Sequence, residues 1–174
     1  MRSRRLVIDA SVAGISEYPV SKANRDFLME VRAVCHKVVM TPEISVEWQN
    51  HGTKFALGWQ KSMMARRKLA TLFVLHNSVL RVRIRQAQIT PRQRRAMEKD
   101  APLLEAALSA DRIVISRDEE ARGLYKALAA DWPPLRDVLW LQPDESPTEA
   151  LDWLRRGAKP TRKWQLGAMS SVVE

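Results

Sequence analysis

Residues 5–11 constrain the fold more than any other stretch of this chain. Residues 6–8 are an uninterrupted run of branched apolar side chains, which is typical of a strand buried on both faces of a parallel sheet. The run ends in Asp9, and Ser11 follows two positions later. Ligands of open parallel α/β sheets bind beyond the carboxyl ends of the strands. Asp9 is therefore a candidate functional acid, although an acid that merely ends a strand or caps a turn gives the same pattern.

Strands and helices are predicted to alternate along the chain. Short apolar runs predict four further strands, at residues 37–41, 80–85, 112–118 and 138–141. Amphipathic patterns and capping residues predict helices at residues 21–34, from 43, 54–73, from 90, from 100, 121–128 and 146–155. This alternation indicates one α/β domain at residues 1–157, and the basic residues 158–174 are expected to form a loosely attached tail.

Three of these elements depend on local signals. In residues 80–85, Leu, Val and Ile alternate with three arginines, a period of two that is typical of a half-buried strand at a sheet edge. Pro102 is expected only in the first turn of a helix, so a new helix is predicted to start at Asp100. Residues 146–149, Ser-Pro-Thr-Glu, have the form of a capping box at the start of the last helix.

The charge balance indicates a polyanionic partner. The 174 residues include 29 Lys and Arg against 20 Asp and Glu, a formal charge of +9, and nucleic acid is the commonest partner of such a surface. A membrane is not expected, because no apolar run approaches the ~20 residues that span a bilayer. The single Cys35 excludes an intrachain disulfide and fits the reducing cytoplasm. With His36, His51 and His76 scattered, nothing indicates a zinc site.

Four acids stand out by their positions. Asp9 and Asp118 follow two apolar runs, Asp100 is predicted to begin the helix before the fourth strand, and Glu47 follows the second strand. In a parallel sheet all four would lie near the carboxyl edge. Carboxylates at close range repel one another unless a cation neutralises them, and oxygen ligands suit Mg²⁺ or Mn²⁺. The alternatives are that Asp100 is only a helix cap and Glu47 only a solvated helix residue.

Taken together, the four acids and their flanking residues resemble the motifs of PIN-domain nucleases. The motifs, each short, are Val-Ile-Asp-Ala-Ser at 7–11, Pro42 with Glu47 five residues later, Asp-Ala followed by Ala at 100–107, and an apolar strand followed by Ser-Arg-Asp at 113–118. Their order and spacing cover residues 5–141. One departure is that the family often continues the last motif with an acid and an aromatic residue, whereas here Glu120 stands for the acid and Ala121 replaces the aromatic residue.

The resemblance implies a fold, an activity and a set of partners. The fold would be a three-layer α/β/α domain with a parallel five-stranded sheet of order 3-2-1-4-5. The activity would be metal-dependent cleavage of RNA, often by a homodimer, and many small members are toxins neutralised by an antitoxin protein. The implied catalytic residues are Asp9, Glu47, Asp100 and Asp118, of which the three aspartates would be the metal ligands. Ser11, Ser116 and Glu120 would support them.

A long basic interval supplies an independent argument for the substrate. No Asp or Glu lies between Glu47 and Glu98, whereas the same interval holds eleven Lys and Arg residues. Such a run is either a solvated face or the binding surface of a polyanion such as the RNA backbone, or of an acidic antitoxin. The residues predicted to bind RNA are Arg81, Arg83 and Arg85, followed by Arg66, Arg67 and Lys68.

Two functions from different classes follow from the sequence. The first is a Mg²⁺-dependent endoribonuclease, which the intact set of four acids favours. The alternative is a catalytically inactive PIN-like module that binds nucleic acid or another protein. Metal-dependent cleavage of RNA, with a chelator control, distinguishes them.

Overall fold

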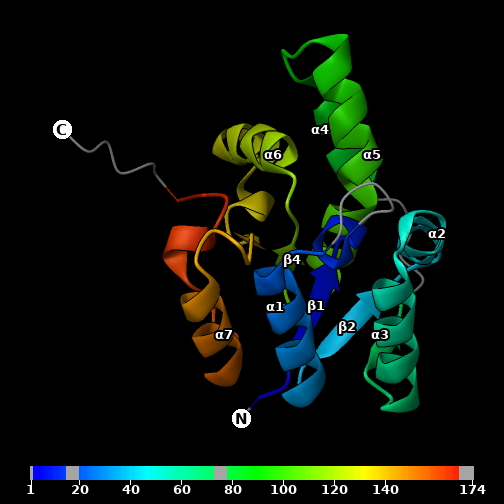
Figure 1. Ribbon diagram of the computed structural model, residues 1–174. Helices are drawn as coiled ribbons and strands as arrows, with labels where there is room; N and C mark the ends of the chain where they lie inside the picture. The colour runs from blue at the N-terminus through cyan, green and yellow to red at the C-terminus, as the bar shows by residue number, and fades with distance from the viewer. Residues whose placement is uncertain (1, 15–19, 73–77, 169–174) are drawn as a thin grey trace.

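The protein is built on one parallel sheet of five strands (Figure 1). The computed structural model describes residues 2–14, 20–72 and 78–168. The sheet has the order β3-β2-β1-β4-β5, and each neighbouring pair is parallel. The strands are β1 (Arg5–Ile8), β2 (Lys37–Met40), β3 (Leu69–Thr71), β4 (Ile113–Ile115) and β5 (Leu139–Leu141). The predicted α/β fold and its strand order are thus confirmed.

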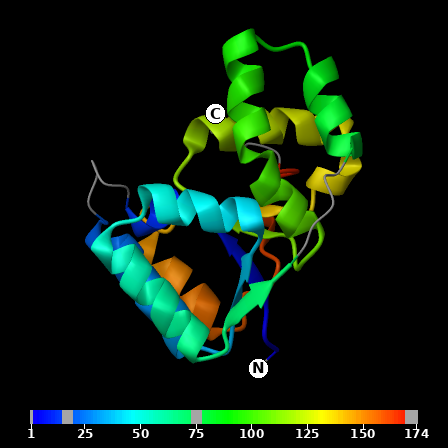
Figure 2. The same cartoon turned by 90° about the vertical axis from the view of Figure 1, so that its right-hand side faces the viewer.

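Helices cover both faces of the sheet (Figures 1 and 2). They are α1 (Lys22–Ala33), α2 (Pro42–His51), α3 (Lys54–Ala65), α4 (Ser78–Gln86), α5 (Pro91–Leu108), α6 (Glu119–Asp131) and α7 (Pro147–Arg155), with short 3₁₀ turns η1 (Ala10–Ala13), η2 (Pro133–Leu135) and η3 (Arg162–Trp164). Helices α1, α3 and α7 lie on one face, and α5 with α6 on the other. Helix α4 and the first half of α5 form a hairpin that rises beyond the carboxyl edge of the sheet. Within the described residues, no helix is long and apolar enough to cross a membrane.

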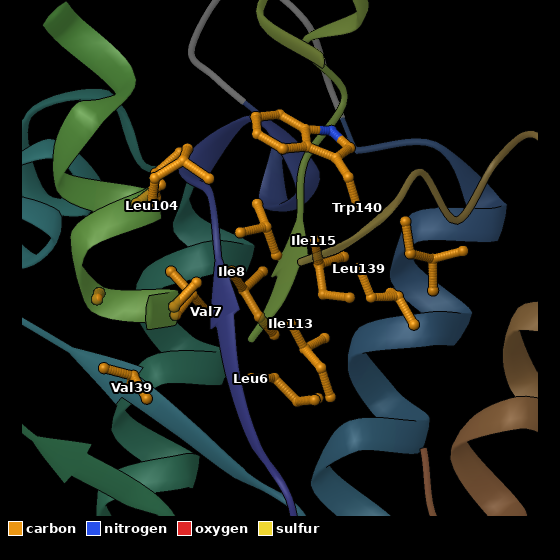
Figure 3. Close-up of a cluster of buried hydrophobic side chains, with 14 of the residues drawn as sticks. Leu6, Val7, Ile8, Val39, Leu104, Ile113, Ile115, Leu139 and Trp140 are labelled. Carbon is orange, nitrogen blue, oxygen red and sulfur yellow. The ribbon is translucent and has the colours of Figure 1, made fainter. Parts of the chain in front are cut away.

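Strand β1 lies at the centre of the apolar core. Its residues Leu6, Val7 and Ile8 are completely buried, and Figure 3 shows them among apolar side chains of the neighbouring strands and of α5. Burying one such side chain stabilises a fold by roughly 1.5–3 kcal/mol. Because β1 is paired on both edges and covered on both faces, the residue that follows it is held at a fixed point of the sheet.

Side chains cap the first turn of α1 and of α5, as predicted, but not that of α7. The Ser21 hydroxyl accepts a hydrogen bond from the backbone of α1, and Thr90 with Gln93 forms a complete capping box at the start of α5. The capping box predicted at residues 146–149 is wrong in its hydrogen bonds, since Ser146 precedes α7 without a side-chain cap. There Pro147 at the first helical position supplies the start signal.

The third strand lies earlier in the chain than the alternating pattern predicted. Residues 80–85 belong to α4, and Leu80 and Ile84, four positions apart, are both fully buried while Val82 is 43 % exposed. The apolar period is therefore that of a helix rather than of a strand. The predicted helix at 54–73 is also too long: α3 ends at Ala65, Arg67 turns the chain with a φ of 56°, and β3 follows. Residue 73 lies outside the described part of the chain.

Helix α5 continues through its proline. It runs without a break from Pro91 to Leu108 with Pro102 inside it, so the prediction of a new helix at Asp100 is wrong. A proline in a helix costs one backbone hydrogen bond. The apolar residues Met97 and Leu104, on either side of the proline, are both buried, and their packing compensates for the missing bond.

The segment after α7 is packed rather than loose as far as residue 168. Trp164 and Leu166 are buried, the Leu166 backbone N–H donates to the Val138 carbonyl (2.9 Å), and Gln165 forms an antiparallel bridge with Leu139. The expectation of a loosely attached tail is therefore wrong for residues 158–168. Although this segment is basic, its apolar residues Trp164 and Leu166 are buried and cover the outer edge of β5.

A buried histidine joins three elements at the opposite, amino-terminal edge of the sheet. His36 is fully buried; its Nδ1 accepts from the Arg4 backbone N–H (3.1 Å), and its Nε2 lies 3.0 Å from the Leu154 carbonyl. Because Nδ1 accepts, the ring is neutral and Nε2 donates. Burial lowers the pKa of His36, and the cations Lys68 and Arg4 lower it further, against the raising effect of the Leu154 hydrogen bond.

We expect His36 to make the fold sensitive to acid. Its folded-state pKa lies below the unfolded value of 6.5, so its contribution to stability is complete above about pH 6.5 and is lost as the pH falls below it. Denaturant unfolding of wild type and His36→Gln at about pH 7 and about pH 5 measures this. The variant should lose less stability over that interval than wild type. His51→Gln, which removes an exposed histidine, should keep the wild-type difference; equal profiles for all three proteins would contradict the assignment.

Candidate active site

The four acids singled out in the sequence line one pocket. It has a volume of about 560 Å³, and Asp9, Glu47, Asp100 and Asp118 all contribute to its wall. Asp9 follows β1 and Asp118 lies shortly after β4, whereas Glu47 comes from α2 and Asp100 from α5. Strands β1 and β4 are neighbours in the sheet at the point where the strand order reverses. Such a switch point is where open α/β sheets bind their ligands.

Backbone pairing and a tryptophan hold Asp9 in place. The Asp9 backbone N–H donates to the Ile115 carbonyl (2.9 Å), so the pairing of β1 with β4 extends to the acid itself. The Trp48 indole N–H donates to the Ile8 carbonyl (3.0 Å), and its ring stacks on Trp59 with centroids 5.5 Å apart. A buried indole bonded to the last carbonyl of β1 also fixes the strand end that carries Asp9.

Two serine hydroxyls orient the Asp9 carboxylate. Those of Ser11 and Ser116 both donate to the same oxygen, Asp9 Oδ2, the latter at 2.9 Å. Each hydroxyl in turn accepts a backbone N–H, Ser116 from Asp118 (3.1 Å) and Ser11 from Arg117 (3.3 Å). Asp9 Oδ1 has no hydrogen bond to the described residues, so one oxygen is fixed while the other remains for a ligand.

The other acids approach the pocket from three helices. Asp118 caps α6, its Oδ1 accepting from the Ala121 backbone N–H (2.8 Å). Asp100 lies in the middle of α5 and is only 6 % exposed. Glu47 is half-buried on α2, with the ammonium of Lys99 at 4.0 Å from its Oε1. All of these carboxylates reach the pocket from rigid elements.

The carboxylates are close enough to perturb one another. Burial raises the pKa of Asp100 to about 7, and the charges of Asp9, Asp118 and Glu47 raise it too, while Lys99 lowers it. The pKa of Glu47 is raised by burial first and by Asp9 second. Near neutral pH Asp100 is therefore only partly ionised, and a cation bound in the pocket would favour loss of its proton.

The donor chemistry of the pocket fits Mg²⁺ or Mn²⁺. Its acidic walls offer only carboxylate oxygens, the ligands these ions prefer, and mutual repulsion of the acids is the condition that a cation relieves. The described residues nevertheless include no group of three or more His, Cys, Asp or Glu side chains arranged so that it could hold a metal ion. The acids thus share one pocket without forming a preassembled ligand set.

One predicted supporting residue lies outside the pocket wall. Glu120 is exposed and lies 3.8 Å from Arg92 of α5, whereas its neighbour Glu119 lines the pocket. The two residues are successive positions of the first turn of α6, and of the two only Glu119 lines the pocket. A supporting role of Glu120 stays a prediction.

The predicted basic set Arg66, Arg67 and Lys68 lies at the edge of the sheet opposite the pocket. Leu69, the next residue, pairs with Val38 near the start of β2, so the set is at the edge opposite Asp9. Arg66 and Arg67 are exposed there. The Lys68 ammonium donates to three carbonyls at the end of α1, those of Val31 (2.7 Å), Arg32 (2.8 Å) and Val34. Lys68 thus caps the end of α1, and RNA binding by this basic set stays a prediction.

The second basic set divides between two roles. Arg81 forms a two-pronged ion pair with the buried Glu105, Nε to Oε1 and Nη2 to Oε2 both at 2.9 Å. It therefore fastens α4 to α5 and is not a free surface charge. Arg83 and Arg85 are exposed on α4, in the hairpin that rises on the carboxyl side of the sheet, so their role in RNA binding stays a prediction.

Besides Glu119, four polar or charged residues of the pocket wall were not identified from the sequence. They are His51, Lys99, Arg117 and Gln142. Gln142 follows β5 directly, as Asp9 follows β1, so the same strand-exit argument applied to the fifth strand identifies it. Lys99 and Arg117 are direct neighbours of predicted acids. His51 ends α2 one helical turn beyond Glu47, a spacing that places both on one face.

No family model, curated protein or solved structure matches this chain. The resemblance to PIN-domain nucleases therefore rests on the four sequence motifs. The strand order and the shared pocket of the four acids are observed independently of it.

Replacing Asp100 with Asn is expected to stabilise the metal-free protein at alkaline pH. Its pKa of about 7 in the folded chain exceeds the ordinary 3.8, so the folded state loses stability as the pH rises from about 4 to about 7. We expect the variant to gain about 1–3 kcal/mol of unfolding free energy at about pH 8 in a chelator, and little at about pH 4. Urea unfolding measures both, with Glu98→Gln, an exposed acid of the same helix, as control. A variant less stable than wild type at the higher pH would contradict this electrostatic account.

Proposed function

We propose that this chain is a Mg²⁺- or Mn²⁺-dependent endoribonuclease with a PIN-like active site. The observation that carries the proposal is that Asp9, Glu47, Asp100 and Asp118, far apart in the sequence, line one pocket at the switch point of a parallel sheet. The formal charge of +9 supports a polyanionic substrate. Arg83 and Arg85 would contact the RNA backbone next to the pocket.

The acids divide the work in this proposal. Asp9, Asp100 and Asp118 would hold the ion, and Glu47 completes the negative site. When bound, the ion supplies an activated water and offsets the charge that develops on the phosphodiester. Ser11 and Ser116 keep the Asp9 carboxylate in one orientation through its Oδ2, and Asp100 releases its proton when the site is filled.

Two observations favour other functions and define the rivals. His51 lines the pocket, so a metal-free ribonuclease that uses the RNA 2′-hydroxyl as nucleophile has a candidate base. The described residues hold no preassembled metal-binding group, which favours a catalytically inactive module that only binds nucleic acid or a protein. The two experiments below separate these rivals from the proposed enzyme.

Replacing Asp9 with Asn should abolish cleavage without unfolding the chain. The substitution keeps the shape and removes one anionic ligand, and we expect RNA cleavage with Mg²⁺ to fall by about 100-fold or more. Asp137→Asn is the matched control, because Asp137 is exposed and pairs with Arg112 at the far end of the sheet. Cleavage should also stop in EDTA and return with excess Mg²⁺. Wild-type activity in Asp9→Asn would overturn the assignment, and no cleavage by wild type would favour the binding module.

The ends of the cleaved RNA report the route of the reaction. Attack by water on phosphorus that breaks the P–O3′ bond would leave a 5′-phosphate, with the 3′-oxygen departing as a hydroxyl, and the 2′-hydroxyl would take no part. The His51 route leaves a 2′,3′-cyclic phosphate instead. We expect 5′-phosphate ends in wild type and in His51→Gln, as measured by end-labelling and mass spectrometry of the fragments. Cyclic ends, or cleavage in EDTA that disappears in His51→Gln, would assign the chemistry to the histidine.

A further inference from the structure

The pocket has an electrostatic problem that its acids alone do not solve. Four carboxylates and the nearby Glu119 line it, and together they repel the phosphate group of any RNA that approaches. A cation in the wall, independent of a bound metal ion, would offset this repulsion. Three basic side chains line the pocket, those of His51, Lys99 and Arg117.

Arg117 is the basic side chain that is held in position. Its Nε donates to Asp144 Oδ2 (3.1 Å), and its backbone N–H donates to the Ser11 hydroxyl that also holds Asp9. Its side chain is 36 % exposed, whereas that of Lys99 is 70 % exposed and lies 4.0 Å from its nearest carboxylate, Glu47. Arg117 therefore keeps a defined position relative to Asp9 through hydrogen bonds that Lys99 does not make with the described residues.

The anchor leaves the outer end of the guanidinium available. Asp144 engages Nε, and neither Nη atom of Arg117 donates a hydrogen bond to the described residues. Asp144 lies in the turn after β5, and its second oxygen, Oδ1, is buried without a partner in the described structure. The Asp144 carboxylate thus accepts a hydrogen bond from one nitrogen of Arg117, and this bond fixes the position of the arginine side chain. The two free Nη groups form the fork that suits a phosphate.

We propose that Arg117 binds a backbone phosphate of the substrate beside the carboxylate cluster, and that Asp144 is the positioning residue that aims it. This inference rests on the ribonuclease function proposed above. The simpler interpretation is that the pair only ties the end of β4 to the turn after β5. A tie alone would not affect how RNA binding depends on salt, which gives the test its distinguishing measurement.

The test measures RNA binding rather than cleavage. Fluorescence anisotropy of a short fluorescein-labelled single-stranded RNA is recorded with Ca²⁺ in place of Mg²⁺, over a series of salt concentrations, and a gel checks that the RNA stays intact. Mn²⁺ binding to the same proteins is followed by electron paramagnetic resonance, and thermal unfolding checks the fold.

Arg117→Gln should weaken RNA binding about tenfold, as expected for one lost charge-assisted contact. The slope of log Kd against log salt should fall by about 0.7, the share of one phosphate contact on a single strand. Arg117→Lys, which keeps the charge but loses the fork, should keep the slope and weaken binding less. Arg112→Gln is the matched control, since Arg112 is at the other end of β4 and is also paired with an aspartate, Asp137; it should change neither quantity.

Asp144→Asn tests the positioning role in the opposite electrostatic direction. Loss of a negative charge near the pocket would by itself strengthen RNA binding. Weaker binding with an unchanged salt slope would therefore support the role of Asp144 in positioning Arg117. Mn²⁺ binding should persist in every variant.

Two outcomes overturn the inference and are distinguishable. If wild type binds neither RNA nor Mn²⁺, the proposed function fails and the inference fails with it. If wild type binds both and cleaves RNA, but Arg117→Gln keeps the wild-type Kd and salt slope, only the role of Arg117 is refuted. If Arg117→Gln does not fold, Arg117→Lys and Asp144→Asn decide between the same alternatives.

Discussion

The whole structure depends on β1 being paired on both edges and buried on both faces. Its residues Leu6, Val7 and Ile8 have no exposed surface, and its pairing with β4 continues one residue further, to the backbone of Asp9. The apolar core thereby fixes a polar group at the point where the strand leaves it. Two serines and the indole of Trp48 complete this support.

The core also makes the pocket energetically costly. The acids line one pocket at the end of a buried strand, and burial first and neighbouring negative charges second raise the pKa of Asp100 and of Glu47. Perturbed titration in a cleft is typical of functional sites. The paired arginine Arg81 and the cap Lys68, in contrast, use their charge to hold helices together.

Sequence patterns correctly predicted those elements in which all side chains have the same surroundings, such as a strand that is buried on both faces. Residues 6–8 read as a buried strand because every side chain is apolar, and the strand-exit rule then identified Asp9 and Asp118. The prediction failed where tertiary contacts determine the secondary structure. Leu80 and Ile84 form the buried stripe of a helix, although the alternating arginines indicated a strand. Helix α5 continues through Pro102, although the proline indicated a new helix start. Partners distant in sequence, such as Glu105 for Arg81, cannot be identified from the charge run itself. The same holds for Arg117, whose anchor Asp144 lies on another element.

The unbroken course of α5 has a mechanical consequence. The outer half of this helix belongs to the hairpin with α4, and the inner half is buried against β1 and β4. Asp100 lies between them, two residues before Pro102, where the missing backbone bond makes the helix easiest to bend. One continuous helix therefore carries both the Asp100 carboxylate and the outer half of the hairpin, and a bend at Pro102 would change the direction of one relative to the other.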